Sequence, residues 1–178
     1  MSPPTRNQLL AEAECLIRRG GYSAFSYADL AEKIGITKAS IHYHFPSKQN
    51  LVEEVAEVAM SRFVERLGEI DARQTDATSR LTEYGAMFLE GFEERLRPLC
   101  CALSSDLAAL PSSRGSKVKS YFDVHLEWLT RVVESGMAAG VLRWEGEATN
   151  LAHLILTTLE GGSLVGRARQ SRAEVLTG

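Results

Sequence analysis

Apolar residues recur at intervals of three and four along most of this chain, which is the spacing of one face of an α-helix. In the first part this pattern predicts helices over residues 5–19, 26–34, 37–45 and 48–67. A polar stretch at 71–79 interrupts the pattern and is predicted to be a loop. The second part continues it, with predicted helices over residues 80–95, 98–110, 114–139 and 145–167. The sequence therefore predicts an all-α protein in two parts.

The stretch from Ser26 to Lys48 has the features of two short helices joined by a tight turn. Gly35 follows the apolar face of the first helix and supplies the backbone freedom that a tight turn requires. Thr37 is a suitable N-cap for the next helix, because its hydroxyl can accept a hydrogen bond from an unpaired backbone N–H. Pro46 ends that helix, since the residue before a proline is driven toward extended geometry. This layout predicts a helix-turn-helix whose second helix enters the major groove of DNA.

The motif I-T-K-A-S-I-H-Y-H-F-P-S-K-Q-N-L at residues 36–51 resembles the tetracycline-repressor (TetR) family of bacterial transcription regulators. The upstream G-G-Y-S-A-F-S-Y-A-D-L-A, residues 20–31, also fits that family, and the resemblance is specific over roughly residues 9–55. It implies a three-helix helix-turn-helix DNA-binding domain at 1–48 and a helical ligand-binding and dimerisation domain at 49–178.

The same resemblance implies a homodimer, with the two long C-terminal helices of each subunit forming a four-helix bundle. Such a dimer binds double-stranded operator DNA at a palindrome, since the symmetry of the protein is matched by that of its site. It represses transcription while bound and releases the operator on binding a small-molecule effector, which the sequence does not identify.

Roles for individual DNA-binding residues follow from their positions in the family motif. Lys38 and His42 are expected to reach base edges, where lysine can donate to guanine and histidine can donate or accept. Ala39 suits contact with a thymine methyl group, and hydroxyls, aromatic tips and ammonium groups suit phosphates. A helix start at Ser26 can also bind a phosphate. The full predicted set is Ser26, Thr37, Lys38, Ala39, Ser40, His42, Tyr43, His44 and Lys48.

The net charge of −3 argues at first against binding DNA. The charge is unevenly distributed, however: residues 1–50 carry six Lys/Arg against four Asp/Glu, and the remaining residues carry 14 against 19. The basic excess therefore lies in the segment with the helix-turn-helix pattern. Because it is small, we expect the protein to dimerise in order to accumulate phosphate contacts.

A mostly apolar set of side chains with a few polar groups is typical of small-molecule pockets. In the second part this description fits Tyr84, Met87, Phe88, Cys100, Phe122, His125 and Trp128, which form the predicted ligand-binding set. Aromatic stripes at helical spacing are also typical of an ordinary core, and this alternative stays open. His125 and His153 could meet a carboxylate such as Asp106 or Glu160, and a polar residue lining a pocket is favoured over a metal site.

Cys100 and Cys101 are adjacent and allow a different regulatory chemistry. Thiols near a helix start can have a lowered pKa and react with electrophiles or oxidants. This gives one alternative function, a thiol-sensing repressor. The other interpretation is that both are small buried apolar residues, as free cysteines often are.

Several other classes of protein are disfavoured by what the sequence lacks. It contains no nucleophile elbow, zinc-protease, phosphate-loop or dinucleotide motif, so we expect neither an enzyme nor a cofactor. No apolar run reaches the length of a membrane span, and the N-terminus has no hydrophobic signal region, so a cytoplasmic location is expected. A helical module that binds a protein partner is the remaining alternative, should DNA binding fail.

Overall fold

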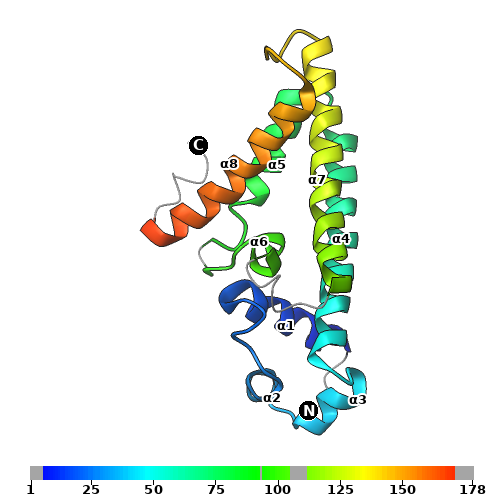
Figure 1. Ribbon diagram of the computed structural model, residues 1–178, viewed down its shortest axis with the longest axis vertical. Helices are drawn as coiled ribbons and strands as arrows, with labels where there is room; N and C mark the ends of the chain where they lie inside the picture. The colour runs from blue at the N-terminus through cyan, green and yellow to red at the C-terminus, as the bar shows by residue number, and fades with distance from the viewer. Residues whose placement is uncertain (1–5, 93, 105–111, 171–178) are drawn as a thin grey trace. The chain divides into compact units, whose positions relative to one another are not determined.

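The computed structural model of the protein describes residues 6–92, 94–104 and 112–170 (Figure 1). Within these residues every regular element is an α-helix, which confirms the predicted fold class. The helices are α1 (Arg6–Gly20), α2 (Tyr27–Ile34), α3 (Lys38–His44), α4 (Lys48–Arg73), α5 (Ala77–Met87), α6 (Leu99–Ser104), α7 (Ser112–Ala138) and α8 (Ala148–Arg169).

The chain divides into two compact units, and the division does not follow the order of the sequence. Unit 1 comprises Met1–Ser61 and Leu99–Val118, and unit 2 comprises Arg62–Pro98 and Lys119–Gly178. The helices α4 and α7 therefore each contribute residues to both units. The predicted domain boundary after residue 48 stays a prediction.

The core of unit 1 is built by short amphipathic helices that each bury one face. Helix α1 packs against α2 and α6, and α2 packs against α3. Most of the buried side chains come from the apolar stripes that the sequence predicts: Leu9, Leu10, Ala13 and Ile17 of α1, Leu30 and Ala31 of α2, Ile41 of α3, and Leu51 and Val55 of α4. Val52 of α4 is also buried although it lies outside the predicted stripe, and Val58, which the stripe included, is 39% exposed. This packing fixes the orientation of α3 within unit 1.

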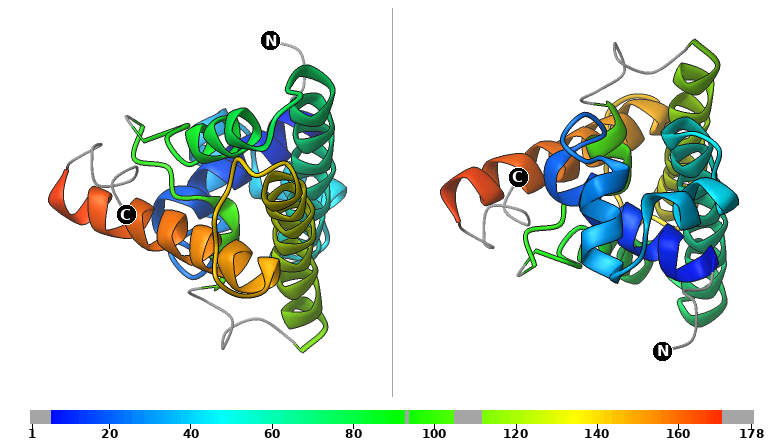
Figure 2. Two further views of the ribbon diagram at one scale, coloured as in Figure 1. Left: turned by 90° about the horizontal axis from the view of Figure 1, so that it is seen from above. Right: turned by 90° about the horizontal axis from the view of Figure 1, so that it is seen from below.

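The core of unit 2 joins α4, α5, α7 and α8, whose ribbons lie together in both orientations of Figure 2. Its largest buried side chains are Trp128 and Tyr84, which stack with ring centroids 5.3 Å apart. The indole N–H of Trp128 donates to a carboxylate oxygen of Asp71 at 3.1 Å. This bond supplies the partner that a buried indole needs.

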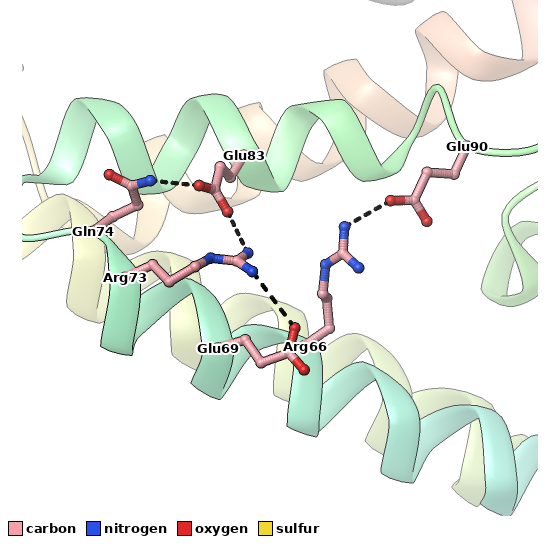
Figure 3. A network of polar contacts seen from close by, with 6 residues as sticks. All are labelled: Arg66, Glu69, Arg73, Gln74, Glu83 and Glu90. Carbon is pink, nitrogen blue, oxygen red and sulfur yellow. Dashed lines mark hydrogen bonds and ion pairs between the residues drawn. The ribbon is translucent and has the colours of Figure 1, made fainter.

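A row of polar contacts joins α4 to α5 along one side of unit 2 (Figure 3). Arg73 donates to Glu83 at 2.8 Å, and Arg66 donates to Glu90, just beyond α5, at 3.0 Å. The hydrogen bonds from Gln74 and Arg73 lower the pKa of Glu83, so this carboxyl stays ionised. Because these side chains are largely exposed, the ion pairs position the two helices more than they stabilise the fold.

Two predicted element boundaries were wrong. The predicted loop at 71–79 is mostly helical, because α4 continues to Arg73 and α5 begins at Ala77. Asp76 is the N-cap of α5, and its carboxylate accepts a hydrogen bond from the N–H of Ser79 at 2.9 Å. The helix predicted over 80–95 ends at Met87, and the chain continues as tight turns. In these turns an N–H bonds to the carbonyl three residues before it at Phe88, Leu89, Glu90, Phe92 and Arg95. Gly91 there has a φ of 74°.

The remaining helix boundaries agree with the sequence pattern to within a few residues. The predicted helix over 98–110 appears as α6, and residues 105–111 lie outside the described part of the chain. No helix of the described part is long and apolar enough to cross a membrane.

Candidate nucleic-acid interface

The turn between α2 and α3 has the geometry that the sequence predicts. Gly35 has φ 77° and ψ 38°, and its N–H donates to the carbonyl of Ala31 at 2.9 Å. This is a left-handed C-cap, which glycine adopts without steric cost. Thr37 begins α3 as an N-cap, and its hydroxyl accepts a hydrogen bond from the N–H of Ser40 at 3.2 Å. The turn therefore joins α2 to α3 with a hydrogen-bonded cap at the end of one helix and at the start of the other.

Ser26 forms a capping box with Asp29 at the start of α2. The Ser26 hydroxyl accepts from the N–H groups of Ala28 and Asp29, and the Asp29 carboxylate accepts from the Ser26 N–H at 2.6 Å. The hydrogen bonds from Ser26 lower the pKa of Asp29. The box thus puts a negative charge next to the position where a phosphate is predicted, and the phosphate role of Ser26 stays a prediction.

The recognition helix α3 has one buried face and one exposed face. Ile41 and the C-cap residue Phe45 are buried, with exposed fractions of 0% and 1%. The opposite face presents most of the predicted DNA-binding residues to solvent: Lys38, Ala39, Ser40, His42 and Tyr43, while His44 is half-buried. Tyr43 is 86% exposed. The ring and hydroxyl of Tyr43 are therefore accessible to a partner.

The C-terminal end of α3 is fixed by contacts from α1 and α2. The hydroxyl of Tyr27 donates to the carbonyl of Phe45 at 2.9 Å in a buried position. Burial raises the pKa of Tyr27 to about 12, so the hydroxyl keeps the proton that it donates. The guanidinium of Arg6 lies 5.0 Å from the centre of the Phe45 ring and forms an ion pair with Glu54.

His42 is exposed, but its ring is also held in place. Its Nδ1 lies 3.2 Å from the carbonyl oxygen of Pro46. Its ring meets that of Tyr27 at an interplanar angle of 65°, with the centroids 4.8 Å apart. The side chain is therefore oriented before any partner binds.

Lys48 has partners within the protein that sequence reasoning missed. Its ammonium donates to the backbone carbonyls of Tyr22 and Phe25. It also lies 4.3 Å from the centres of both aromatic rings. The ammonium of Lys48 therefore anchors the loop between α1 and α2. The predicted contact of Lys48 with a phosphate stays a prediction.

Five of the seven predicted ligand-binding residues meet in unit 2, around His125. The imidazole Nδ1 is 2.6 Å from the hydroxyl of Tyr84, and the rings of Phe88 and Phe122 lie 6.3 and 6.5 Å from the imidazole. Trp128 stacks on Tyr84. The other two are Met87, which packs against the same core, and Cys100, which belongs to α6 in unit 1.

Two members of the aromatic cluster around His125 are absent from the predicted set. Phe63 stacks on the imidazole at 4.0 Å, and Tyr121 meets it edge-on at 5.2 Å. Their helical spacing marks both as core residues, but spacing along single helices does not show which helices meet. His125 is 3% exposed, and its burial lowers its pKa to about 3, so the imidazole is neutral near pH 7.

The other residues considered for regulation lie in separate places. Cys100 is buried, Cys101 and Cys15 are half-buried, and all three are free thiols. His153 is exposed, and its Nδ1 lies 2.8 Å from the Thr149 carbonyl of its own helix. Asp106 lies outside the described residues.

Comparison with known proteins agrees with this architecture. The family model of bacterial regulatory proteins of the tetR family matches residues 9–55, which include the whole turn and α3. The crystal structure of a TetR-family transcriptional regulator from Agrobacterium tumefaciens is 33% identical, with a TM-score of 0.90, and the match covers 95% of this chain and 90% of that one.

Two curated relatives match over most of the chain. The nucleoid occlusion factor SlmA of Marinobacter nauticus is 27% identical over 160 residues, which is 89% of this chain and 82% of that protein. The transcriptional regulator TtgR of Pseudomonas putida is 24% identical over 166 residues, which is 88% of this chain and 77% of that protein. From the motif, the fold and these likenesses together, the chain belongs to the TetR family of bacterial transcription regulators.

Proposed function

We propose that this protein represses transcription by binding a palindromic operator as a homodimer, and that a small molecule bound in unit 2 releases it. The observation that carries this proposal is the division of α3 into a buried face and an exposed face. Ile41 and Phe45 anchor the helix, and Lys38, His42 and Tyr43 are left to contact DNA. In this arrangement base contacts supply specificity and phosphate contacts supply most of the affinity.

The exposed face of α8 supports dimerisation. From Ala148 to Ala168 its exposed residues are Thr149, Asn150, His153, Leu154, Thr157, Gly161, Leu164, Val165 and Ala168, none of which is a lysine, arginine or carboxylate, and the first exposed charge is Arg169 at the end of the helix. Leu154, Leu164 and Val165 are 50%, 56% and 49% exposed. Gly161 has open space where a Cβ would stand, so another helix could approach closely there. A second copy of α8 is the proposed occupant, and the dimer then presents two α3 helices to one palindrome.

The aromatic cluster around His125 is the proposed effector site. It combines aromatic rings with a few polar groups, the neutral imidazole and the hydroxyls of Tyr84 and Tyr121, which is the usual chemistry of a small-molecule site. The effector must bind the DNA-competent and released states unequally, since otherwise it shifts no equilibrium. A coupling free energy of about 1–3 kcal/mol is typical of such regulation. The alternative of thiol sensing rests on Cys100 and Cys101, of which Cys101 is the more accessible.

The proposal is tested by measuring DNA binding with and without a change on α3. The first step is selection of a site from a randomised DNA pool, followed by fluorescence anisotropy titration at two salt concentrations. We expect two subunits, or a multiple of two, per palindromic site. Lys38→Ala should weaken specific binding by roughly tenfold or more, because one good base contact contributes about 1–3 kcal/mol.

Lys119→Ala is the matched control, since Lys119 is an exposed lysine of unit 2 that pairs with Asp123. Equal effects of the two substitutions would contradict the assignment of α3 as the recognition helix. If no site is selected at any salt concentration, the function as a binding module for another protein becomes the better explanation.

The likeness to a nucleoid occlusion factor supports a second candidate function, nucleoid occlusion, for which we expect DNA binding dispersed around the chromosome rather than at a few promoters. Immunoprecipitation of the protein with its bound DNA distinguishes the two. Binding concentrated upstream of one or a few genes supports the repressor. Binding dispersed around the chromosome, with no change in nearby transcription, supports the second function.

A further inference from the structure

The hydrogen bond of His42 determines which of its two ring nitrogens carries the proton. Nδ1 lies 3.2 Å from the carbonyl oxygen of Pro46. A carbonyl oxygen can only accept, so the proton of this bond must be on Nδ1. The edge contact with Tyr27 holds the ring in this orientation, and Tyr27 is itself fixed by its buried bond to the carbonyl of Phe45.

This assignment decides what the other ring nitrogen can do. A neutral imidazole has one N–H, so with the proton on Nδ1 the Nε2 atom has a free lone pair and acts as an acceptor. His42 is exposed on the face of α3 that is proposed to meet the major groove. The Nε2 atom of His42 is therefore a hydrogen-bond acceptor, although histidine as a residue type can donate or accept.

We propose that His42 recognises a base that presents an amino group in the major groove, which is adenine through N6 or cytosine through N4. These are the only major-groove donors, whereas guanine presents two acceptors and thymine presents one acceptor and a methyl group. The inference rests on the proposed function, because it assigns a base class to one residue of the same recognition helix.

Lys38 complements this assignment. It is four residues before His42, so the two side chains share one face of the helix. Lysine has only donors, which suit the O6 and N7 acceptors of guanine. The helix therefore carries a donor and an acceptor side by side, and each half of the operator should contain a guanine contacted by Lys38 and an amino-bearing base contacted by His42.

The tautomer is measured first, and without DNA. In full-length protein labelled with ¹⁵N, long-range ¹H–¹⁵N correlation spectra distinguish a protonated Nδ1 from a protonated Nε2, and comparison with His42→Gln identifies the signals of His42. A buffer of pH 8.5 keeps an ordinary imidazole neutral. We expect the proton on Nδ1. A proton on Nε2 would overturn the inference, whatever the protein binds.

The base class is then measured by site selection with three proteins. Wild type should select adenine or cytosine at one position in each half-site. His42→Lys, which can only donate, should change the preference at that position to guanine. His42→Ala, which can neither donate nor accept, should relax it. Wild-type selection of guanine or thymine at every position that His42→Lys alters would overturn the inference.

A final comparison removes only the amino group from the selected base. Replacing the selected adenine or cytosine by the same base without its amino group should weaken binding of wild type by about tenfold, as expected for the loss of one base contact. The same change should have little effect on His42→Ala, and an equal loss in both proteins would show that another residue contacts the amino group. If wild type selects no site although Nδ1 is protonated, the proposed function fails, and the base assignment fails with it.

Discussion

Replacement of Lys48 by methionine separates two roles that this residue can have. Methionine keeps a long apolar stem but has no ammonium. If the ammonium anchors the loop between α1 and α2, its loss should lower the free energy of unfolding. If it contacts a phosphate, its loss should change the salt dependence of DNA binding. We expect the first result, because the ammonium is bonded to the carbonyls of Tyr22 and Phe25 and lies against both of their rings.

The expected magnitudes follow from these contacts. A hydrogen bond to a charged donor contributes about 1.5 kcal/mol or more, so two of them contribute roughly 3 kcal/mol. On the DNA side, each phosphate contact adds about 0.9 to the slope of log K against log salt concentration. A dimer would use Lys48 twice, so loss of a real phosphate contact would reduce the slope by about 1.8.

Two assays give these quantities. Urea unfolding should show Lys48→Met to be less stable than wild type by roughly 3 kcal/mol, and anisotropy titrations over a range of salt concentrations should give an unchanged slope. Gln49→Met is the matched control, since Gln49 is the exposed next residue of the same helix. A free energy of unfolding for Lys48→Met equal to that of Gln49→Met would refute the anchoring argument, and a slope reduced by about 1.8 would establish the phosphate contact.

Two further predictions concern unit 2. An unfolded histidine takes up a proton near pH 6.5, whereas burial lowers the pKa of His125 to about 3, so between these values only the unfolded state gains the proton. The free energy of unfolding should therefore fall as the pH is lowered through this range. Measured by urea unfolding, the decrease in this free energy between pH 6 and pH 4.5 should be about 2 kcal/mol larger for wild type than for His125→Gln. An equal fall in both proteins would show that His125 is not the titrating group. Gly136→Ala should lower the free energy of unfolding by about 1–3 kcal/mol, because the added Cβ would lie 2.8 Å from the Cβ of Ala77. Gly68 has open space where a Cβ would stand, so Gly68→Ala should raise the free energy of unfolding by about 0.5–1 kcal/mol in the same assay. A stable Gly136→Ala would show that the neighbouring helices can separate at little cost.

The parts of the fold that the sequence predicts well depend on contacts between near neighbours. Ser26 and Thr37 cap helices through bonds to residues two or three positions away, and Gly35 ends α2 through a bond to Ala31. Such bonds are decided by residue type and spacing, so a single sequence is enough to place them. The exposed and buried faces of α3 follow from the same periodicity.

Contacts between distant parts of the chain could not be predicted in this way. The anchoring of Lys48 depends on where the loop at Tyr22 passes, and the cluster around His125 depends on which helices meet. A distant partner is also involved at one of the two wrong boundaries. Asp71 looks like a loop residue in the sequence, but in the folded chain it continues α4 and accepts the hydrogen bond of Trp128.

The two faces of α3 have a consequence for how operator specificity can change during evolution. The side chains that stabilise the fold, Ile41 and Phe45, are buried, whereas Lys38, Ala39 and Tyr43 are exposed. If these exposed residues contact bases as proposed, their exchange alters the recognised sequence with little loss of folding free energy. Duplicated genes of this architecture could diverge toward new operators through a few substitutions on seven residues. The same property makes α3 a practical segment to randomise when a regulator for a chosen operator is wanted.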